Sequence, residues 1–276
     1  MSATLNEKTQ NQTVDTTPEK VDKDKKYEGI IEYDTPAYKP RKRKLRDRYD
    51  GRYLKTAPPM LKLMPYLMKV RADSQNQFED VIDITNVEKY LAKKKKEGYT
   101  DMSLLHVFLA AYVRVVCERP AIHRFIAGQK IFSRKKIECL MTIKKDMSLD
   151  GLDTCIKVEF DPRDNIYNVY KKFQKTVIQA KNDDGDFESI VGTLVKLPGL
   201  VLRFAIGFLR GLDYFGMLPK ALHKISPFHG SMIITSMGSL GIPAIYHHLY
   251  DFGHLPIFLS YGKMFTKEVT LMDGTK

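Results

Sequence analysis

The chain has 276 residues, of which 43% are hydrophobic and 28% are charged, and its formal net charge is +12. This length can bury one large core, and no window reaches the roughly eighteen apolar residues of a membrane span or begins like a secretion signal. Its three cysteines, Cys117, Cys139 and Cys155, are too few and too far apart for a disulfide framework. We therefore expect a cytoplasmic protein whose cysteines act as small apolar residues.

Much of the positive charge lies near the N-terminus. The run PRKRKLRDR at 40–48 contains six basic residues. We predict a disordered basic tail over 1–55 and a folded domain over 56–276. Solvation or contact with a neighbouring subunit is the favoured role of the tail, and an anionic membrane surface is an alternative. Nucleic acid is disfavoured as a partner because the tyrosines near this run are too sparse for base stacking.

The folded domain begins with mixed strand and helix patterns. Apolar and acidic residues alternate over 78–84, which predicts a half-buried strand. A helix follows at once, with Thr85 and Glu88 as its capping box. It carries the lysine run at 93–96 on its last turn, where positive charge suits the helix dipole, and Gly98 supplies a left-handed stop.

The middle of the chain predicts two more helices and two strands. The helix that follows Asp101 or Ser103 and ends before Pro120 is apolar on nearly every face, which predicts burial, with His106 as a packed, hydrogen-bonded histidine. Alternating segments at 137–144 and 154–160 predict strands. A third helix is predicted from residue 164 to about 180, followed by the acidic loop NDDGDFE.

Residues 190–222 are hydrophobic but interrupted by charges. Pro198 can open a helix here, after which Arg203 and Arg210, seven residues apart, fall on one stripe of an otherwise apolar cylinder. The favoured interpretation is a helix that covers the sheet or a neighbouring subunit. The alternative is a helix that binds a membrane surface or an acyl chain, with its arginines reaching toward water.

The stretch FHGSMIITSMGSLGIPAIYHHLYDFGHLPIFLSYGK, residues 228–263, is the most informative. It predicts a short buried strand at 232–237, a tight turn at GSLG, and a second strand at 255–264. Thr235 and Ser236 are consecutive on the first strand, and neighbouring strand residues face opposite sides of a sheet. One hydroxyl can therefore point into a cleft while the other faces away from it.

Three pieces of the chain, from about residue 58 onward, resemble the catalytic domain shared by chloramphenicol acetyltransferase and the acyltransferase component (E2) of 2-oxo acid dehydrogenase complexes. FEDVIDITNVEKYLAKKK is similar to the family's early ID-T-L element. LLHVFLAAYVRVVCERPAIHRFI is similar to its core helix, with His123 where asparagine is usual, and ITSMGSLG resembles its strand and turn TISNLGMFG. The resemblance implies an α+β fold, a two-layer α/β sandwich with a mixed sheet.

The resembled family transfers acyl groups between coenzyme A and a thiol. A histidine in a C-terminal H-x-x-x-D-G motif is the general base, and a strand hydroxyl donates a hydrogen bond to the oxyanion. Alignment on the turn glycines implies that Thr235 is this oxyanion donor, with acyl-CoA as substrate and no metal. The histidine motif does not occur in the sequence, so we expect the general base to lie outside these residues.

His247 and His248 are the alternative base. In HHLYDFG, Phe252 separates Asp251 from Gly253, so neither histidine has the motif's spacing to both residues, and the segment precedes the last predicted strand instead of following it. A structural or subunit-contact role is therefore favoured for this pair, and a metal site completed by His254 is a further alternative.

The predicted function is that of a stand-alone CoA-dependent acyltransferase, impaired because its general base is missing. The final residues, KEVTLMDGTK, predict one arm of a hairpin without its partner, so we expect a truncated chain. No lipoyl hairpin precedes the domain, which predicts no covalently attached lipoyl group, and the resemblance implies a homotrimer. The alternative is a catalytically silent scaffold that binds a membrane surface or a protein partner through 190–222.

Overall fold

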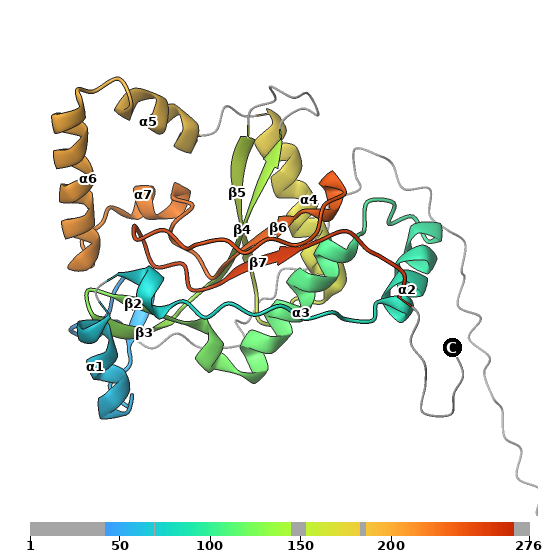
Figure 1. Ribbon diagram of the computed structural model, residues 1–276, viewed down its shortest axis with the longest axis horizontal. Coiled ribbons are helices and arrows are strands. Elements are labelled where there is room, and N and C mark those ends of the chain that lie inside the picture. The colour runs from blue at the N-terminus through green and yellow to red at the C-terminus, as the bar shows by residue number, and fades with distance from the viewer. Residues whose placement is uncertain (1–41, 69, 145–152, 183–185, 268–276) are drawn as a thin grey trace, which may run out of the picture.

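The computed structural model describes residues 42–68, 70–144, 153–182 and 186–267. Its larger sheet has four strands in the order β5-β4-β6-β7 (Figure 1). Strands β4 (Ile137–Lys144) and β5 (Asp153–Phe160) are antiparallel, whereas β6 (Met232–Ser236) runs parallel to β4 and β7 (Phe258–Tyr261) runs parallel to β6. The predicted α+β class with a mixed sheet is confirmed.

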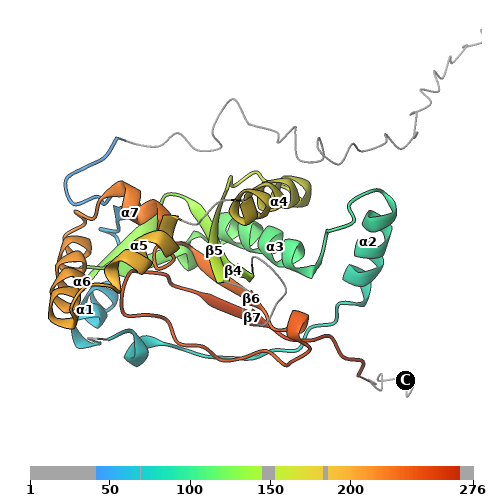
Figure 2. The ribbon, with the colours of Figure 1, turned by 90° about the horizontal axis from the view of Figure 1, so that it is seen from above.

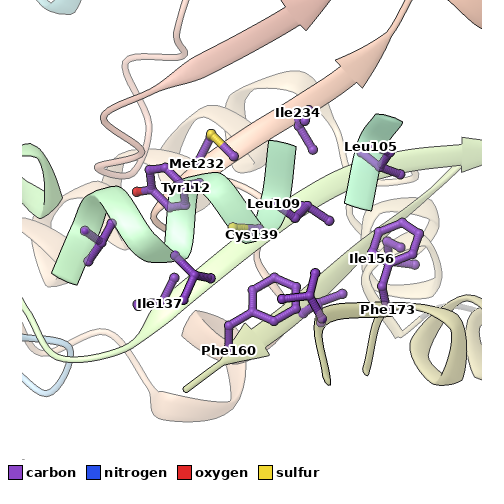
Figure 3. Packing of buried hydrophobic residues seen from close by; sticks show 14 residues of the cluster. Leu105, Leu109, Tyr112, Ile137, Cys139, Ile156, Phe160, Phe173, Met232 and Ile234 are labelled. Carbon is purple, nitrogen blue, oxygen red and sulfur yellow. The ribbon is translucent and has the colours of Figure 1, made fainter. Parts of the chain in front are cut away.

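Helices α3 (Leu104–Glu118) and α4 (Ile166–Asn182) lie on the same side of this sheet (Figures 1 and 2). The strand residues that face them are apolar and alternate along each strand with residues that face the other side of the sheet. Figure 3 shows this core, in which the buried residues from the sheet and the two helices include Leu105, Leu109, Val169, Phe173, Cys139, Ile156, Val158, Met232 and Ile234.

Helix α3 begins as predicted, directly after Ser103. The backbone N–H of Ser103 donates to Nδ1 of His106, 3.1 Å away, which satisfies the N-cap. His106 is buried against the rings of Tyr170 and Phe173, and burial lowers its pKa to about 4. The prediction of a packed, hydrogen-bonded histidine is therefore confirmed, and His106 has a structural role.

A second, smaller sheet has the order β1-β3-β2. Strand β3 (Lys130–Arg134) pairs with both β2 (Arg124–Ala127) and β1 (Gly51–Tyr53). Because β1 is a strand of this sheet and Asp47, Arg48 and Asp50 are buried, the predicted tail boundary at residue 55 is wrong. The folded domain includes 42–55, since the buried ion pairs of this segment hold it against the core.

Helix α1 (Pro59–Leu67) follows β1 and is followed by the 3-10 turn η1 (Arg71–Ser74). A second 3-10 turn, η2 (Pro120–His123), comes directly after α3. The predicted strand at 78–84 does not form. This segment has no ladder partner among the described residues, and its Phe78 side chain is 88% exposed. It lies beside segment 242–257, and the Tyr246 hydroxyl donates a hydrogen bond to the Glu79 carboxylate (Figure 2).

Helix α2 (Thr85–Lys96) forms as predicted, but its cap differs from the prediction. The backbone N–H and the hydroxyl of Thr85 both donate to Oδ1 of Asp83, at 2.8 and 2.6 Å. Asp83 thus replaces the predicted Thr85–Glu88 capping box, because a carboxylate accepts two hydrogen bonds and also suits the positive end of the helix dipole. Gly98 ends the helix with a φ of 101°, as predicted.

Residues 190–222 are largely helical, as predicted, and contribute to α5 (Asp186–Leu194), α6 (Gly199–Tyr214) and α7 (Lys220–Ile225). The predicted acidic loop is shorter than expected, because α5 begins at Asp186. Helix α6 stands at one end of the molecule (Figure 1), and it does not cover the sheet, since α3 and α4 occupy the apolar face of that sheet. The sheet-covering part of the favoured sequence interpretation is therefore wrong, whereas its other part, contact with a neighbouring subunit, stays a prediction.

The last described elements are a turn and a strand, as the sequence predicts. The GSLG turn contains the 3-10 turn η3 (Gly238–Leu240) and a left-handed Gly241 with a φ of 73°. Strand β7 is shorter than the predicted 255–264. The predicted hairpin at the C-terminal end lies outside the described residues, so the expected truncation stays a prediction.

Candidate functional site

Strand β6 separates its two hydroxyls as the alternation of a strand requires. Met232 and Ile234 are buried toward α3 and α4, and Ser236 lies on the same face, where it bonds the phenol of Tyr261. Thr235 therefore faces the opposite side of the sheet, which the two helices leave free. The predicted placement of one hydroxyl toward the core and one away from it is seen in the structure.

The Thr235 side chain is half-buried and makes no hydrogen bond to any residue in the described parts of the chain. Its neighbour across the strand pair is Ser260 on β7. The Ser260 Oγ accepts a hydrogen bond of 3.1 Å from the backbone N–H of Ile245. The Thr235 hydroxyl therefore remains able to donate to a ligand, while Ser260 holds the adjacent loop segment in place.

His247 lies on the same face of the sheet as Thr235. Its ring is stacked on Phe258, with 4.6 Å between centroids and 8° between planes, and Phe258 precedes Ser260 by two residues on β7. His247 Nδ1 donates to the carbonyl oxygen of His248, 2.6 Å away, which places the lone pair of the neutral ring on Nε2. The imidazole and the free hydroxyl thus share a face, about two residues apart along the strands.

His248 is exposed and stacks on the other side of the His247 ring, at 4.7 Å. The sequence alternative of a metal site formed by His247, His248 and His254 is wrong. In the described residues, the groups that could hold a metal ion are Asp50–His223–His254 and Asp213–His229–His254, and neither includes His247 or His248. His254 belongs to a separate, buried cluster.

We call this second group the buried histidine cluster, and it consists of charged and imidazole side chains from six parts of the chain. Its members are Arg48 and Asp50 before β1, Arg134 at the end of β3, Asp213 in α6, His223 in α7, His229 before β6, and His254 before β7. All seven are buried. They join the N-terminal segment and the α6–α7 region to the segments that lead into β6 and β7.

His254 is the centre of the cluster. Its Nδ1 lies 2.9 Å from Nη2 of Arg134, and its Nε2 lies 2.7 Å from Oδ2 of Asp50. A guanidinium can only donate, so Nδ1 accepts and Nε2 carries the proton that is donated to Asp50. His223 donates from its own Nε2 to the same carboxylate oxygen, 3.1 Å away.

Asp213 forms the second half of the cluster. Its carboxylate lies 2.5 Å from Nη2 of Arg48, and Arg48 also bonds Asp50 through Nε at 3.1 Å. Nε2 of His229 lies 3.5 Å from the other Asp213 oxygen, too far for a good hydrogen bond, while His229 Nδ1 lies 2.7 Å from Oγ of Ser226. Arg48 thus bridges the two carboxylates.

The charges of the cluster balance when its histidines are neutral, because two arginines face two aspartates. Burial lowers the pKa of His229, and burial together with the charge of Arg134 lowers the pKa of His254 well below its usual value. The pKa of Asp50 is also lowered: burial raises it, but the hydrogen bonds from His223 and His254 outweigh that effect. The cluster is therefore a buried network of ion pairs in which the imidazoles of His229 and His254 are neutral.

This network does not fit a metal ion. A ligating histidine normally donates its second ring N–H to a carboxylate or a carbonyl. If Nε2 of His254 bound a metal, its Nδ1 would carry the proton and would face the donor groups of Arg134. A divalent cation would also add two positive charges to a cluster that is already balanced.

The buried histidine cluster was not predicted from the sequence. Its members are separated by up to about two hundred residues, and single histidines in apolar surroundings are usually structural. The RDRYDGR run, which supplies Arg48 and Asp50, was assigned to the tail. The signal that could have shown otherwise is the acidic pair Asp47 and Asp50 within a basic run, because both carboxylates are buried and bonded.

No protein-family profile and no curated protein matches this sequence. Among solved structures, the chain is similar to a probable dihydrolipoamide acetyltransferase from Listeria monocytogenes 4b F2365, with 17% identity, a TM-score of 0.46, and coverage of 81% of this chain and 80% of that one. It is also similar to the cubic core of the pyruvate dehydrogenase multienzyme complex, with 13% identity, a TM-score of 0.41, and coverage of 72% and 68%.

Proposed function

We propose that this chain binds an acyl-CoA thioester and transfers the acyl group to a thiol, with Thr235 as the hydrogen-bond donor to the tetrahedral oxyanion. The observation that carries this proposal is the Thr235 hydroxyl, which has no hydrogen-bond partner in the described residues and lies on the face of β6 turned away from α3 and α4. The His247 imidazole lies on the same face. A donor aimed at the developing negative charge is most effective when it has no competing partner in the protein.

The thiol must lose its proton as it attacks the thioester carbonyl. The sequence predicts that the family's histidine base lies outside these residues, and within the described chain His247 is the best-placed substitute. Its Nδ1 is fixed by the carbonyl of His248, so Nε2 is free to accept a proton. By the spacing of neighbouring strands, Phe258 below this ring is roughly 7–8 Å from Thr235, which leaves room for a reacting carbonyl between them.

The proposed reaction needs only its two substrates, the thiol and the acyl-CoA thioester. The thiol sulfur forms a bond to the carbonyl carbon, its proton passes to the base, and the carbonyl oxygen becomes the oxyanion that Thr235 stabilises. When the intermediate collapses, the bond to the CoA sulfur breaks and the base returns the proton to the CoA thiolate. The acceptor class is a thiol, and the proposal names no particular acyl group.

The test measures acetyl transfer from acetyl-CoA to dihydrolipoamide by the full chain. We expect Thr235→Ala to lower kcat by about 10²-fold or more, as removal of one oxyanion donor does in other acyl-transfer sites. Ser236→Ala is the matched control, because that hydroxyl is next in sequence but faces α3 and α4. Equal rates for Thr235→Ala and the unchanged chain would contradict the proposal, as would equal losses in both variants.

A second pair of variants locates the base. His247→Gln should lower the rate by about 10²-fold, whereas His248→Gln should leave the rate unchanged. If both variants keep the rate while Thr235→Ala loses it, the base lies outside this chain, as the sequence predicts. If the chain shows neither transfer nor binding of CoA in equilibrium dialysis, the proposed function is wrong.

A further inference from the structure

The surface of residues 190–225 has an unusual composition of charges. The sequence contains one acidic residue in this range, Asp213, and that residue is buried against Arg48. The exposed charged residues of the same range are all basic, namely Lys196, Arg203, Arg210, Lys220 and Lys224. Every exposed charge on this surface is therefore positive.

The same surface is also apolar. Leu200, Phe204 and Phe208 follow each other at intervals of four residues along α6, so they form one ridge on the helix. They are 84%, 77% and 59% exposed. Exposed apolar side chains continue on both sides of the helix, at Val195, Leu197, Phe215 and Met217. The hydrophobic ridge of α6 thus has no partner in the described chain.

Arg203 and Arg210 lie beside this ridge, two helical turns apart. They flank an open hollow of about 510 Å³ whose remaining lining is Gly199, Gly207, Leu202 and Ile206. A Cβ atom at either glycine would meet nothing within 4 Å, so the space between the arginines is unobstructed. Arginine binds phosphate oxygens through its planar fork of N–H donors.

Helix α1 lies at the same end of the molecule as α6 in both views (Figures 1 and 2). Its exposed apolar side chains are Met60, Leu61, Leu63, Tyr66 and Leu67. The sequence from 51 to 72 contains no acidic residue, and Lys62 of α1 is exposed. The combination of exposed apolar and basic side chains therefore extends beyond α6.

We propose that the outer face of α6, assisted by α1, docks on the surface of a membrane that contains anionic lipids. Leu200, Phe204 and Phe208 enter the boundary between headgroups and acyl chains, while Arg203 and Arg210 bind lipid phosphates. This arrangement of an apolar ridge beside cations is typical of helices that lie in the membrane interface.

The charges of this surface favour an anionic membrane over a second copy of the chain as its binding partner. In a twofold contact the same patch meets itself, so the cations of one α6 would face those of the other with no exposed carboxylate on this surface to neutralise them. An anionic bilayer supplies the opposite charge and attracts each basic residue near its surface. None of the helices in the described ranges is long and apolar enough to cross a membrane.

The first experiment measures co-sedimentation of the full chain with vesicles of 30% phosphatidylglycerol in phosphatidylcholine, and with vesicles of phosphatidylcholine alone. We expect binding to the anionic vesicles at low salt, weaker binding at high salt, and at least tenfold weaker binding by the double variant Arg203→Glu/Arg210→Glu. Arg114→Glu is the matched control, because Arg114 is a 79% exposed arginine on α3, outside the proposed face.

The second experiment uses the absence of tryptophan from the sequence. Phe204→Trp introduces a single fluorophore into the ridge, and Phe78→Trp places one at an equally exposed site on the 78–84 segment. With anionic vesicles, the emission of the Phe204→Trp variant should shift to shorter wavelength and be quenched by brominated lipid. The emission of the Phe78→Trp variant should remain that of a solvated indole.

Three results would overturn the proposal. Unchanged binding by Arg203→Glu/Arg210→Glu would assign the attraction to other basic residues, such as the run at 40–48. If the emission of the Phe204→Trp variant does not shift when anionic vesicles are added, the ridge stays in water. If light scattering without lipid shows an oligomer that Phe204→Ser dissociates, the face belongs to a second copy of the chain. Far-UV circular dichroism of each variant confirms that it is folded.

Discussion

Nε2 of His254 donates to Oδ2 of Asp50 across 2.7 Å, while Nδ1 of the same ring accepts from Arg134. This relationship joins the segment before β1 to the segment before β7, which are two hundred residues apart in sequence. It fixes the tautomer of the imidazole and holds the ring neutral. The stability of the protein, its response to pH and its behaviour toward metal ions follow from it.

Asp50→Asn should strongly destabilise the fold. The carboxylate accepts hydrogen bonds from two histidines and pairs with Arg48, and its loss leaves buried positive charge without compensation. Breaking a buried pair in this way costs about 3–5 kcal/mol. Urea unfolding followed by circular dichroism measures the change, and Asp73→Asn, at an exposed position, should shift the free energy of unfolding by no more than about 0.5 kcal/mol. Similar losses in both variants would contradict the importance of the cluster.

The fold should lose stability between pH 7 and pH 5. Burial lowers the pKa of His123 to about 3 and that of His106 to about 4, and it lowers the pKa of His229 and His254 as well. The unfolded chain, with histidine pKa values near 6.5, therefore binds more protons below that pH. The stabilisation is complete above pH 6.5 and is lost as the pH falls, by about 1.4 kcal/mol for each histidine one unit below 6.5.

Urea titrations at pH 7.5 and 5.5 measure this dependence. His123→Gln should make it shallower, because it removes one titrating group while an amide can still bond Oγ of Ser231, which lies 2.7 Å from Nε2 of His123. A free energy of unfolding that does not change between these two pH values would show that the imidazoles are not held neutral.

Removal of metal ions should leave the protein unchanged. Because Arg134 donates to Nδ1 of His254, Nε2 of that ring keeps its proton and cannot ligate. Dialysis against EDTA should not lower the melting temperature, and excess Zn²⁺ should not raise it by more than about 2 °C. Stoichiometric zinc in the purified protein that is lost in His254→Gln would instead identify the cluster as a metal centre.

Two glycines should respond in opposite ways to alanine. Gly253 has a φ of 81°, and a Cβ there would overlap the carbonyl oxygen of Phe228, so Gly253→Ala should cost about 3 kcal/mol or more. Gly207 lies within α6 with open space around it, so Gly207→Ala should add about 0.5–1 kcal/mol of stability. Thermal unfolding compares the two variants, and a neutral Gly253→Ala would contradict the tight turn that leads into His254.

Local patterns predicted most of the elements that bury an apolar face. Helices α3 and α4 and strands β4, β5 and β6 follow from periodicity within fifteen or so residues, and their apolar stripes meet in one core. The segment 78–84 shows the limit of this reasoning. Its alternation is that of a strand, but a strand needs a partner edge, and the described structure provides none.

Part of the candidate site could also be predicted from local sequence, and part of it could not. Strand alternation alone predicted that Thr235 and Ser236 face opposite sides, and family resemblance selected Thr235. That Thr235 is the one on the uncovered face, and that His247 shares this face, depended on which side α3 and α4 occupy. Nothing in the residues around HHLYDFG carries that information, because the ring of His247 is positioned by stacking on Phe258, eleven residues later.

The sequence by itself determined the mixture of strands and helices, the helical nature of 190–222 and its excess of apolar and basic residues, since these depend on composition and on spacing within a few turns. Only the tertiary structure decided that residues 47–53 belong to the core, that α6 faces outward, and that Arg48, Asp50, Asp213 and three histidines form one network. The physical reason is that a buried charge is tolerated only where an opposite charge or a hydrogen-bond partner meets it, and those partners come from segments far apart in the chain.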